Sequence, residues 1–122
     1  MSDLINSPKH YTQAGAMLEP IDVIRFAPFD LGNAIKYVCR AGHKNDELED
    51  FRKAEKYLDW AEEGYRLNPE FYDNFVRNHL FNLKKIKPFD CFVGVKAVGL
   101  ICFLEQYIAE NIERLKIERG IK

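Results

Sequence analysis

Four polar side chains in the first half of the chain have the spacing that places them on one side of a helix. They are Asn33, Lys36, Tyr37 and Arg40, at positions i, i+3, i+4 and i+7. A guanidinium can bind a phosphate through two hydrogen bonds, an ammonium can neutralise it, and a phenol can stack on a base or bond to a sugar. The spacing predicts a site for a phosphorylated ligand. The alternative interpretation is an ordinary solvated face, since such faces are common on surface helices.

A second polar face follows in the sequence. Asp50, Lys53 and Tyr57 recur at i, i+3 and i+7, although surface ion pairing along one helix explains this spacing equally well. Because residues 42–45 form a short connection, we expect the two helices to lie antiparallel. The two polar faces would then converge.

The distribution of charge favours a small anionic ligand. The formal net charge is only −1, but residues 31–45 and 74–89 contain basic side chains and no acidic ones. Local positive patches in a nearly neutral chain suit a small anion better than a long polyanion. We therefore expect neither a nucleic acid nor a membrane as a partner.

Two pairs of carboxylates have the spacing that can bind Mg²⁺ on a helix, Glu19 with Asp22 and Glu47 with Asp50. Both pairs also lie at expected helix N-termini, where the helix dipole favours acidic residues. Magnesium is therefore one candidate cofactor, but no metal ligand is assigned. The sequence has no P-loop, no GxGxxG, no HExxH and no nucleophile elbow, so any phosphate chemistry would depend on side-chain cations and a metal.

The elements that must position these residues are helices, which follow an extended N-terminal arm in residues 1–16. A first short helix opens at Pro20, which tolerates the first turn, and is stopped by Pro28. A second helix begins at an Asp30 cap and ends at Gly42, a residue suited to the left-handed position after a helix.

Cap signals also set the next two helices. Asp46, with Glu49 three residues later, resembles a capping box and opens a third helix to about Gly64. Asn68 and Pro69 open a fourth helix. The apolar residues expected to face inward on these two helices are Leu48, Phe51, Ala54, Leu58, Ala61, Tyr65, Phe71, Phe75, Leu80 and Leu83.

A long final helix is expected after residues 87–90 and runs to about Arg119. It is apolar on nearly all sides as far as Leu104, although residues 93–98 could instead form a strand without a partner. Such a helix belongs in the centre of a bundle or in an interface between copies of the chain. The sequence thus predicts an all-α fold, a small bundle of about five helices, and a homo-oligomer.

The cysteines indicate the compartment. Cys39, Cys91 and Cys102 have neither metal-ligand nor CxxC spacing, which favours reduced thiols in the cytoplasm. The N-terminus lacks a signal peptide, and the apolar stretch 91–104 is too short to span a bilayer.

Four segments follow one ordered pattern along the chain. They are residues 7–11 (SPKHY), 19–24 (EPIDVI), 32–44 (GNAIKYVCRAGHK) and 50–58 (DFRKAEKYL). This pattern resembles the small phage-encoded nucleotide kinase-like family. The resemblance covers residues 7–65 of what we expect to be a single domain, 1–122. Residues 66–122 match nothing and are expected to form a helical C-terminal extension that contributes to the core or to an oligomer.

The resemblance implies phosphorylation of deoxynucleoside monophosphates without a Walker motif, in the host cytoplasm. It also implies a set of functional positions, which overlaps the two polar faces. These positions are His10, Tyr11, Asn33, Lys36, Tyr37, Arg40, Lys44, Asp50, Lys53 and Tyr57.

The leading hypothesis is a phage-type nucleotide-binding protein, with or without kinase activity. Lys36, Arg40 and Lys44 would hold phosphates, and Tyr37 or Tyr57 would pack against the base.

Two further residues would assist binding, and one would serve catalysis. Asn33 and His10 would orient the sugar or a phosphate, and Asp50 would hold Mg²⁺ or accept a proton. A non-catalytic protein that sequesters a nucleotide immune signal, cyclic or derived from ADP-ribose, is the second hypothesis. A Mg²⁺-dependent all-α nucleotide pyrophosphohydrolase is the third, and a purely structural protein is the fourth.

Overall fold

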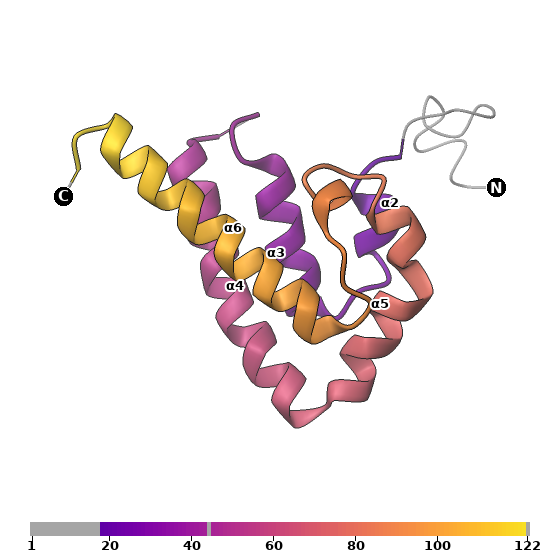
Figure 1. The fold of residues 1–122 in the computed structure, drawn as a ribbon. Helices are drawn as coiled ribbons and strands as arrows, with labels where there is room; N and C mark the ends of the chain where they lie inside the picture. The colour runs from indigo at the N-terminus through magenta and orange to yellow at the C-terminus, as the bar shows by residue number, and fades with distance from the viewer. Residues whose placement is uncertain (1–17, 44, 122) are drawn as a thin grey trace.

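All regular structure in the described part of the chain is helical. The computed structural model describes residues 18–43 and 45–121. Its elements are α2 (Ile21–Ile24), α3 (Phe29–Arg40), α4 (Glu47–Leu67), α5 (Pro69–Leu83), the 3₁₀ turn η2 (Phe89–Cys91) and α6 (Ala97–Glu118) (Figure 1). The predicted small all-α bundle is confirmed. The extended arm expected for residues 1–16 lies outside the described residues.

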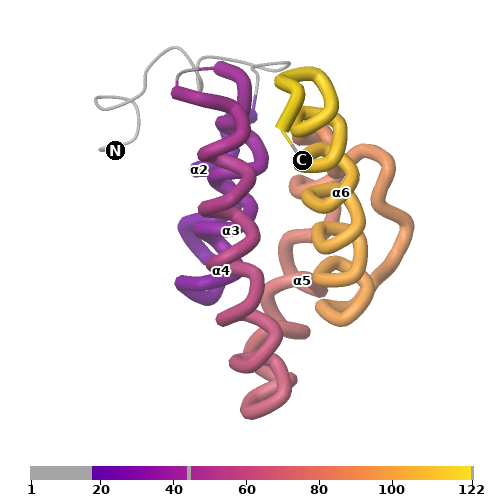
Figure 2. Tube along the Cα trace, turned by 90° about the vertical axis from the view of Figure 1, so that its left-hand side faces the viewer, coloured from indigo at the N-terminus to yellow at the C-terminus, as the bar shows by residue number. Residues whose placement is uncertain are grey.

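Helices α3 and α4 form an antiparallel pair, and α6 runs beside α4 in the opposite direction (Figure 2). The end of α6 meets the start of α4, because Arg114 Nη2 lies 2.8 Å from Glu47 Oε2. A second ion pair joins the same two ends, with Arg119 Nη1 3.0 Å from Asp46 Oδ1. α5 turns back from the end of α4 and packs against both α4 and α6.

The cap chemistry read from the sequence is confirmed at three helix ends. The Asp46 side chain accepts a hydrogen bond from the Glu49 backbone N–H at 2.9 Å and starts α4. The Asn68 side chain accepts a bond from the Phe71 N–H at 3.4 Å and starts α5. Gly42, with φ +86°, follows the end of α3 in the left-handed conformation that glycine tolerates.

Two predicted boundaries are wrong for one shared reason, a contact between α5 and the other helices. Asp30 does not cap α3, which begins at Phe29; its carboxylate instead accepts a bond from the Tyr72 hydroxyl at 2.8 Å. Gly64 does not end α4, which continues to Leu67. A β carbon at Gly64 would lie 2.0 Å from the Tyr72 hydroxyl oxygen, so glycine makes room for this contact inside the helix.

The buried face predicted for α5 is also partly wrong. Phe75 and Leu83 are buried as expected, but Phe71 is 53% exposed and Tyr72 is buried in its place. Burial and the hydrogen bond to Asp30 together raise the pKa of the Tyr72 hydroxyl well above its usual range, so Tyr72 stays a neutral donor.

The final helix starts later than predicted. Residues 92–96 form neither helix nor strand, and α6 begins at Ala97. The Ala97 N–H donates to Asp73 Oδ1 on α5 at 3.0 Å, so a distant side chain serves as the cap that the local sequence lacks. Before it the chain turns tightly, since a β carbon at Gly94 would lie 2.8 Å from the Phe92 ring.

One side of α6 enters the core along most of the helix. Its buried residues are Ala97, Leu100, Ile101, Leu104, Ile108, Ile112 and Leu115. The other side exposes Val98 and Cys102 beside charged residues, so α6 is more amphipathic than its sequence indicated. Among the described helices none is long and apolar enough to cross a membrane. The homo-oligomer expected from this helix stays a prediction.

Carboxylates crowd together where α4 faces α6. Glu62 and Glu105 line a small hollow of about 110 Å³ together with Glu55 and Asp59. The pKa of Glu62 is raised above its ordinary value of 4.5, first by desolvation and then by the charge of Glu105. A carboxyl group whose pKa rises on folding stabilises the fold at low pH, and this contribution is lost as the pH rises through the raised pKa.

We therefore expect Glu62→Gln to stabilise the protein at pH 7 and to have no stabilising effect below about pH 4. Because the site is largely open to water, the gain in Tm should be small, roughly 1–3 °C. Thermal unfolding followed by circular dichroism at several pH values measures it, with Glu63→Gln on the exposed side of α4 as the control. Equal gains at pH 7 and pH 4 would contradict the repulsion.

Candidate functional site

The packing of α3 decides which of its side chains reach a ligand. Leu31, Ala34, Ile35 and Val38 are buried, and Ala41, which follows the helix, is half-buried. The opposite face of the helix therefore points toward α2 and toward solvent. It carries Asn33, Lys36, Tyr37 and Arg40.

A hollow of about 410 Å³ lies between α2 and α3, and we call it the α2–α3 hollow. Its basic lining residues are Lys36, Arg40 and His43, and Ile21 and Ile24 supply apolar surface. The remaining lining residues are Glu19, Pro20 and Cys39. Two cations one helical turn apart thus face an apolar wall, as an amphipathic anion such as a nucleotide requires.

A second hollow of about 360 Å³ adjoins the first, because Ile21, Ile24 and Lys36 line both. Asn33 lies here and not in the α2–α3 hollow. Its side-chain amide donates to the Phe29 carbonyl oxygen at 2.8 Å, so one of its hydrogen-bonding groups is already used within α3.

The polar faces of α3 and α4 do converge, at the ring of Tyr37. This ring stacks on Tyr57 with centroids 5.9 Å apart and planes 10° apart. Lys53 Nζ of α4 lies 5.5 Å from the Tyr37 centroid, and Lys36 Nζ and Arg40 Cζ of α3 lie at 4.7 and 5.5 Å. Three cations therefore surround one ring, each favoured by the ring electrons.

None of these three cations forms an ion pair with a carboxylate within residues 18–43 and 45–121. Arg40 instead reaches the Asn45 side chain, whose oxygen, when the amide is turned toward α3, accepts from Arg40 Nε at 3.2 Å. This neutral partner orients the guanidinium and leaves its charge uncompensated. Neighbouring uncompensated cations repel one another and attract an anion.

Three predicted site residues cannot be placed. His10, Tyr11 and Lys44 lie outside the described residues, so their roles stay predictions.

Asp50, the predicted catalytic residue, is completely buried in the first turn of α4. Neither carboxylate oxygen has a hydrogen-bond partner among the described residues. The side chain lines neither the α2–α3 hollow nor the hollow beside it. The structure therefore does not bring Asp50 to the cations around Tyr37 as an exposed group, and a catalytic role stays a prediction.

The carboxylate pairs considered for Mg²⁺ are engaged in the structure. Asp22 Oδ2 accepts from the Glu19 N–H at 2.8 Å, as a residue near a helix start does. Glu47 binds Arg114. The described part of the chain contains no group of three His, Cys, Asp or Glu side chains close enough to hold an ion.

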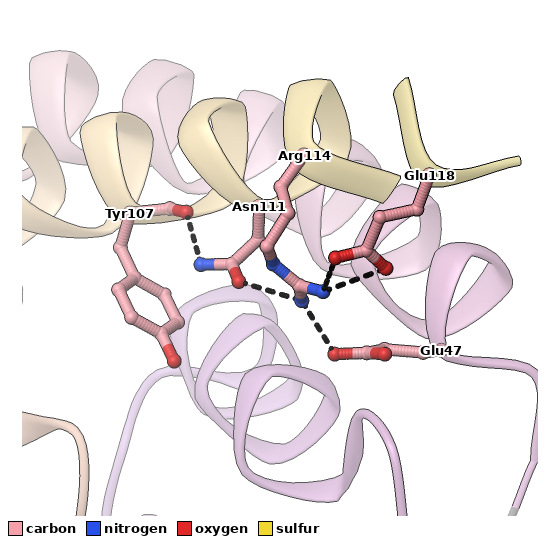
Figure 3. Close-up of polar contacts among 5 residues, drawn as sticks. All are labelled: Glu47, Tyr107, Asn111, Arg114 and Glu118. Carbon is pink, nitrogen blue, oxygen red and sulfur yellow. Dashed lines mark hydrogen bonds and ion pairs between the residues drawn. The ribbon is translucent and has the colours of Figure 1, made fainter. Parts of the chain in front are cut away.

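On the other side of α3 a hollow of about 380 Å³ opens toward α6. Cys39 lines it and donates a weak bond to the Lys87 carbonyl oxygen at 3.8 Å, and burial raises the pKa of this thiol to about 12. Glu47 and Tyr107 also line it, beside the Arg114 network drawn in Figure 3. A thiol held protonated is a poor nucleophile, so Cys39 is not a reactive group of this hollow.

Arg114 organises that network from the last turns of α6. Its guanidinium donates to Glu47, to Glu118 at 3.2 Å and to Asn111 at 3.0 Å, while the Asn111 amide donates to the Tyr107 carbonyl (Figure 3). Arg114 thus joins the end of α6 to the first turn of α4, which marks the network as structural.

Sequence reasoning missed two parts of the site. It did not assign the apolar wall of Ile21 and Ile24 to a ligand, and it did not include Phe29 and Trp60, whose rings contact Tyr57 at centroid distances of 6.0 and 5.4 Å. The i, i+3 spacing of Tyr57 and Trp60, beside the basic residues of α4, was the available signal.

A family model described as a protein of unknown function, DUF3310, matches residues 5–59, a little under half of the chain. The resemblance to a nucleotide kinase-like family is wrong, because the matching family carries no such description and nothing else points to one. The phage origin and the kinase-like activity inferred from it lose their support. No curated protein and no solved structure matches the chain.

The Asp50 carboxylate is buried without a hydrogen-bond partner among the described residues. An unpaired charge without solvent destabilises a fold, so Asp50→Asn, which keeps the shape and removes the charge, should raise the free energy of unfolding by roughly 1 kcal/mol or more. Urea unfolding at pH 7 measures it, with Asp90→Asn, which changes an exposed aspartate in η2, as the control. Destabilisation by Asp50→Asn would mean that the carboxylate is stabilised by contacts outside the described residues.

Proposed function

We propose that the protein binds a nucleotide or a nucleotide-derived small molecule in the α2–α3 hollow. The observation that carries the proposal is the pair Lys36 and Arg40, one turn apart on a rigid helix, lining a hollow of about 410 Å³ beside Ile21 and Ile24. Hollows of roughly 300–1,000 Å³ with apolar walls and a few convergent polar groups are typical of small-molecule sites.

The lining side chains divide the recognition of such a ligand between them. Arg40 can bind two oxygens of one phosphate, and Lys36 neutralises charge as a mobile ammonium. His43 lines the same hollow and adds a nitrogen. The isoleucine wall gives a base or sugar an apolar surface, and Glu19 offers an acceptor for an N–H or O–H of the ligand.

The extent of the family match supports this location. Residues 5–59 contain every side chain that lines the hollow, together with Tyr37, Lys53 and Tyr57, whereas α5 and α6 lie beyond the match. The matched segment thus contains Lys36, Arg40 and Lys53, the three cations around Tyr37, which we call the cationic face.

The test is a thermal-shift screen of nucleoside mono-, di- and triphosphates, cyclic dinucleotides and ADP-ribose, each with and without Mg²⁺. A ligand that binds only the folded state raises Tm by mass action. Mass spectrometry of the recovered ligand separates sequestration, which returns it unchanged, from turnover, which returns a product. If no member of the panel stabilises the protein, the proposal fails.

Lys36→Ala and Arg40→Ala should each weaken binding of the best ligand by roughly 10- to 100-fold, the usual loss for a charge-assisted bond. Isothermal titration calorimetry measures this loss. Lys84→Ala, which removes an exposed lysine at the end of α5, is the matched control and should bind as the unmodified protein does. Equal affinity in all three variants would contradict a site at the α2–α3 hollow.

A further inference from the structure

A continuous row of aromatic rings lies along the outer surface of α3 and α4. We call Phe29, Tyr37, Tyr57 and Trp60 the aromatic strip. Phe29 is 75% exposed and Trp60 is 48% exposed, and Tyr57 lies between them with its ring edge-on to both. Neighbouring aromatic rings left open to water mark a binding surface more often than isolated ones do.

Three lysines lie beside two of these rings. Lys56 Nζ lies 5.6 Å from the centroid of Trp60, and Lys53 and Lys36 lie 5.5 and 4.7 Å from that of Tyr37. The ion pairs formed by described side chains leave out all three lysines. The rings of Trp60 and Tyr37 therefore each have a positive charge beside them that no described carboxylate pairs with.

We propose that the aromatic strip binds a short single-stranded nucleic acid. Bases stack on the exposed rings of Phe29 and Trp60, and phosphates bind Lys53 and Lys56. Exposed rings with lysines beside the strip match the bases and phosphates of a single strand, whereas an apolar protein partner has no use for the lysines. This surface lies beside the α2–α3 hollow and meets it at Lys36 and Arg40.

The acidic residues of α4 limit the length of the bound strand. On the strip side of α4, Lys53 and Trp60 are seven residues apart, a rise of about 10 Å. Glu49 and Glu63 lie one turn beyond them at either end, where they repel a phosphate chain. The net charge of −1, which argued against nucleic acid as a partner, conceals this local arrangement.

The single tryptophan of the chain reports on the strip directly. Oligothymidylates of one to eight nucleotides are titrated into the protein at low salt while Trp60 fluorescence is recorded. Stacking of a base on the indole quenches the emission, affinity increases with length up to roughly four nucleotides, and it falls as salt rises because counterions are released. Equal affinity for the mononucleotide and the longest oligomer, or no quenching at all, overturns the proposal.

Variants locate the bound strand. Trp60→Ala and Lys56→Ala should each weaken binding of a labelled oligothymidylate, measured by fluorescence anisotropy, by roughly tenfold, and Lys56→Ala should reduce the salt slope by about one. Phe81 is 76% exposed with Lys85 Nζ 4.3 Å from its ring centroid, so Phe81→Ala and Lys85→Ala remove a similar pair from α5 and its end. Losses of equal size in these controls overturn the assignment to the strip.

The same variants separate this inference from the proposed nucleotide site. Trp60→Ala and Lys56→Ala leave binding of a mononucleotide in the α2–α3 hollow unchanged, since neither residue lines it. Oligomer binding without any mononucleotide-induced thermal shift supports the strip while the proposed function fails. Mononucleotide binding without any oligomer-induced quenching does the reverse.

Discussion

The stacking of Tyr37 on Tyr57 is the contact on which the cationic face depends. The stacking sets the position of α4 along the axis of α3. In this position Lys53 of α4 reaches the same ring as Lys36 and Arg40 of α3. A shift of one turn between the helices would separate these cations by about 5 Å. The ring thus acts both as a packing element between helices and as the surface around which positive charge collects.

The rest of the bundle holds this pair in place through burial and through contacts at helix ends. α6 buries one face along α4, and Arg114 and Arg119 bind the acidic first turn of α4. The pKa of Asp46 is lowered chiefly by the hydrogen bond that its carboxylate accepts from the Glu49 backbone N–H. Arg119 makes a smaller contribution in the same direction. Exposed ion pairs of this kind stabilise little by themselves. Their effect is to align two helices that apolar burial already holds together.

Local chemistry was readable from the sequence, and contacts between distant segments were not. The caps at Asp46 and Asn68 and the left-handed Gly42 depend on residues within one turn, so the local sequence predicts them. The start of α6 depends on Asp73, 24 residues earlier. The continuation of α4 through Gly64 depends on Tyr72 and its bond to Asp30, 42 residues apart. Residue type alone does not reveal such partners.

The candidate site was likewise predictable only where it depends on local sequence. Helical spacing placed Lys36, Tyr37 and Arg40 on one face, and the short connection after α3 was enough to predict that Lys53 and Tyr57 approach them. The spacing also placed Asp50 with Lys53 and Tyr57, but it could not show that this carboxylate is fully buried. Burial depends on everything that packs over a turn, which periodicity in one helix does not contain.

The most direct test of the central claim is a map of backbone amide chemical shifts during titration with adenosine triphosphate. The chain contains its own comparison, because Lys84, Lys85 and Lys87 form a second basic stretch without acidic neighbours in sequence. Binding in the α2–α3 hollow predicts saturable changes in α2 and in residues 36–43, with the second stretch unaffected. Changes of equal size at both basic stretches, or none at either, would show that the α2–α3 hollow is not a nucleotide site.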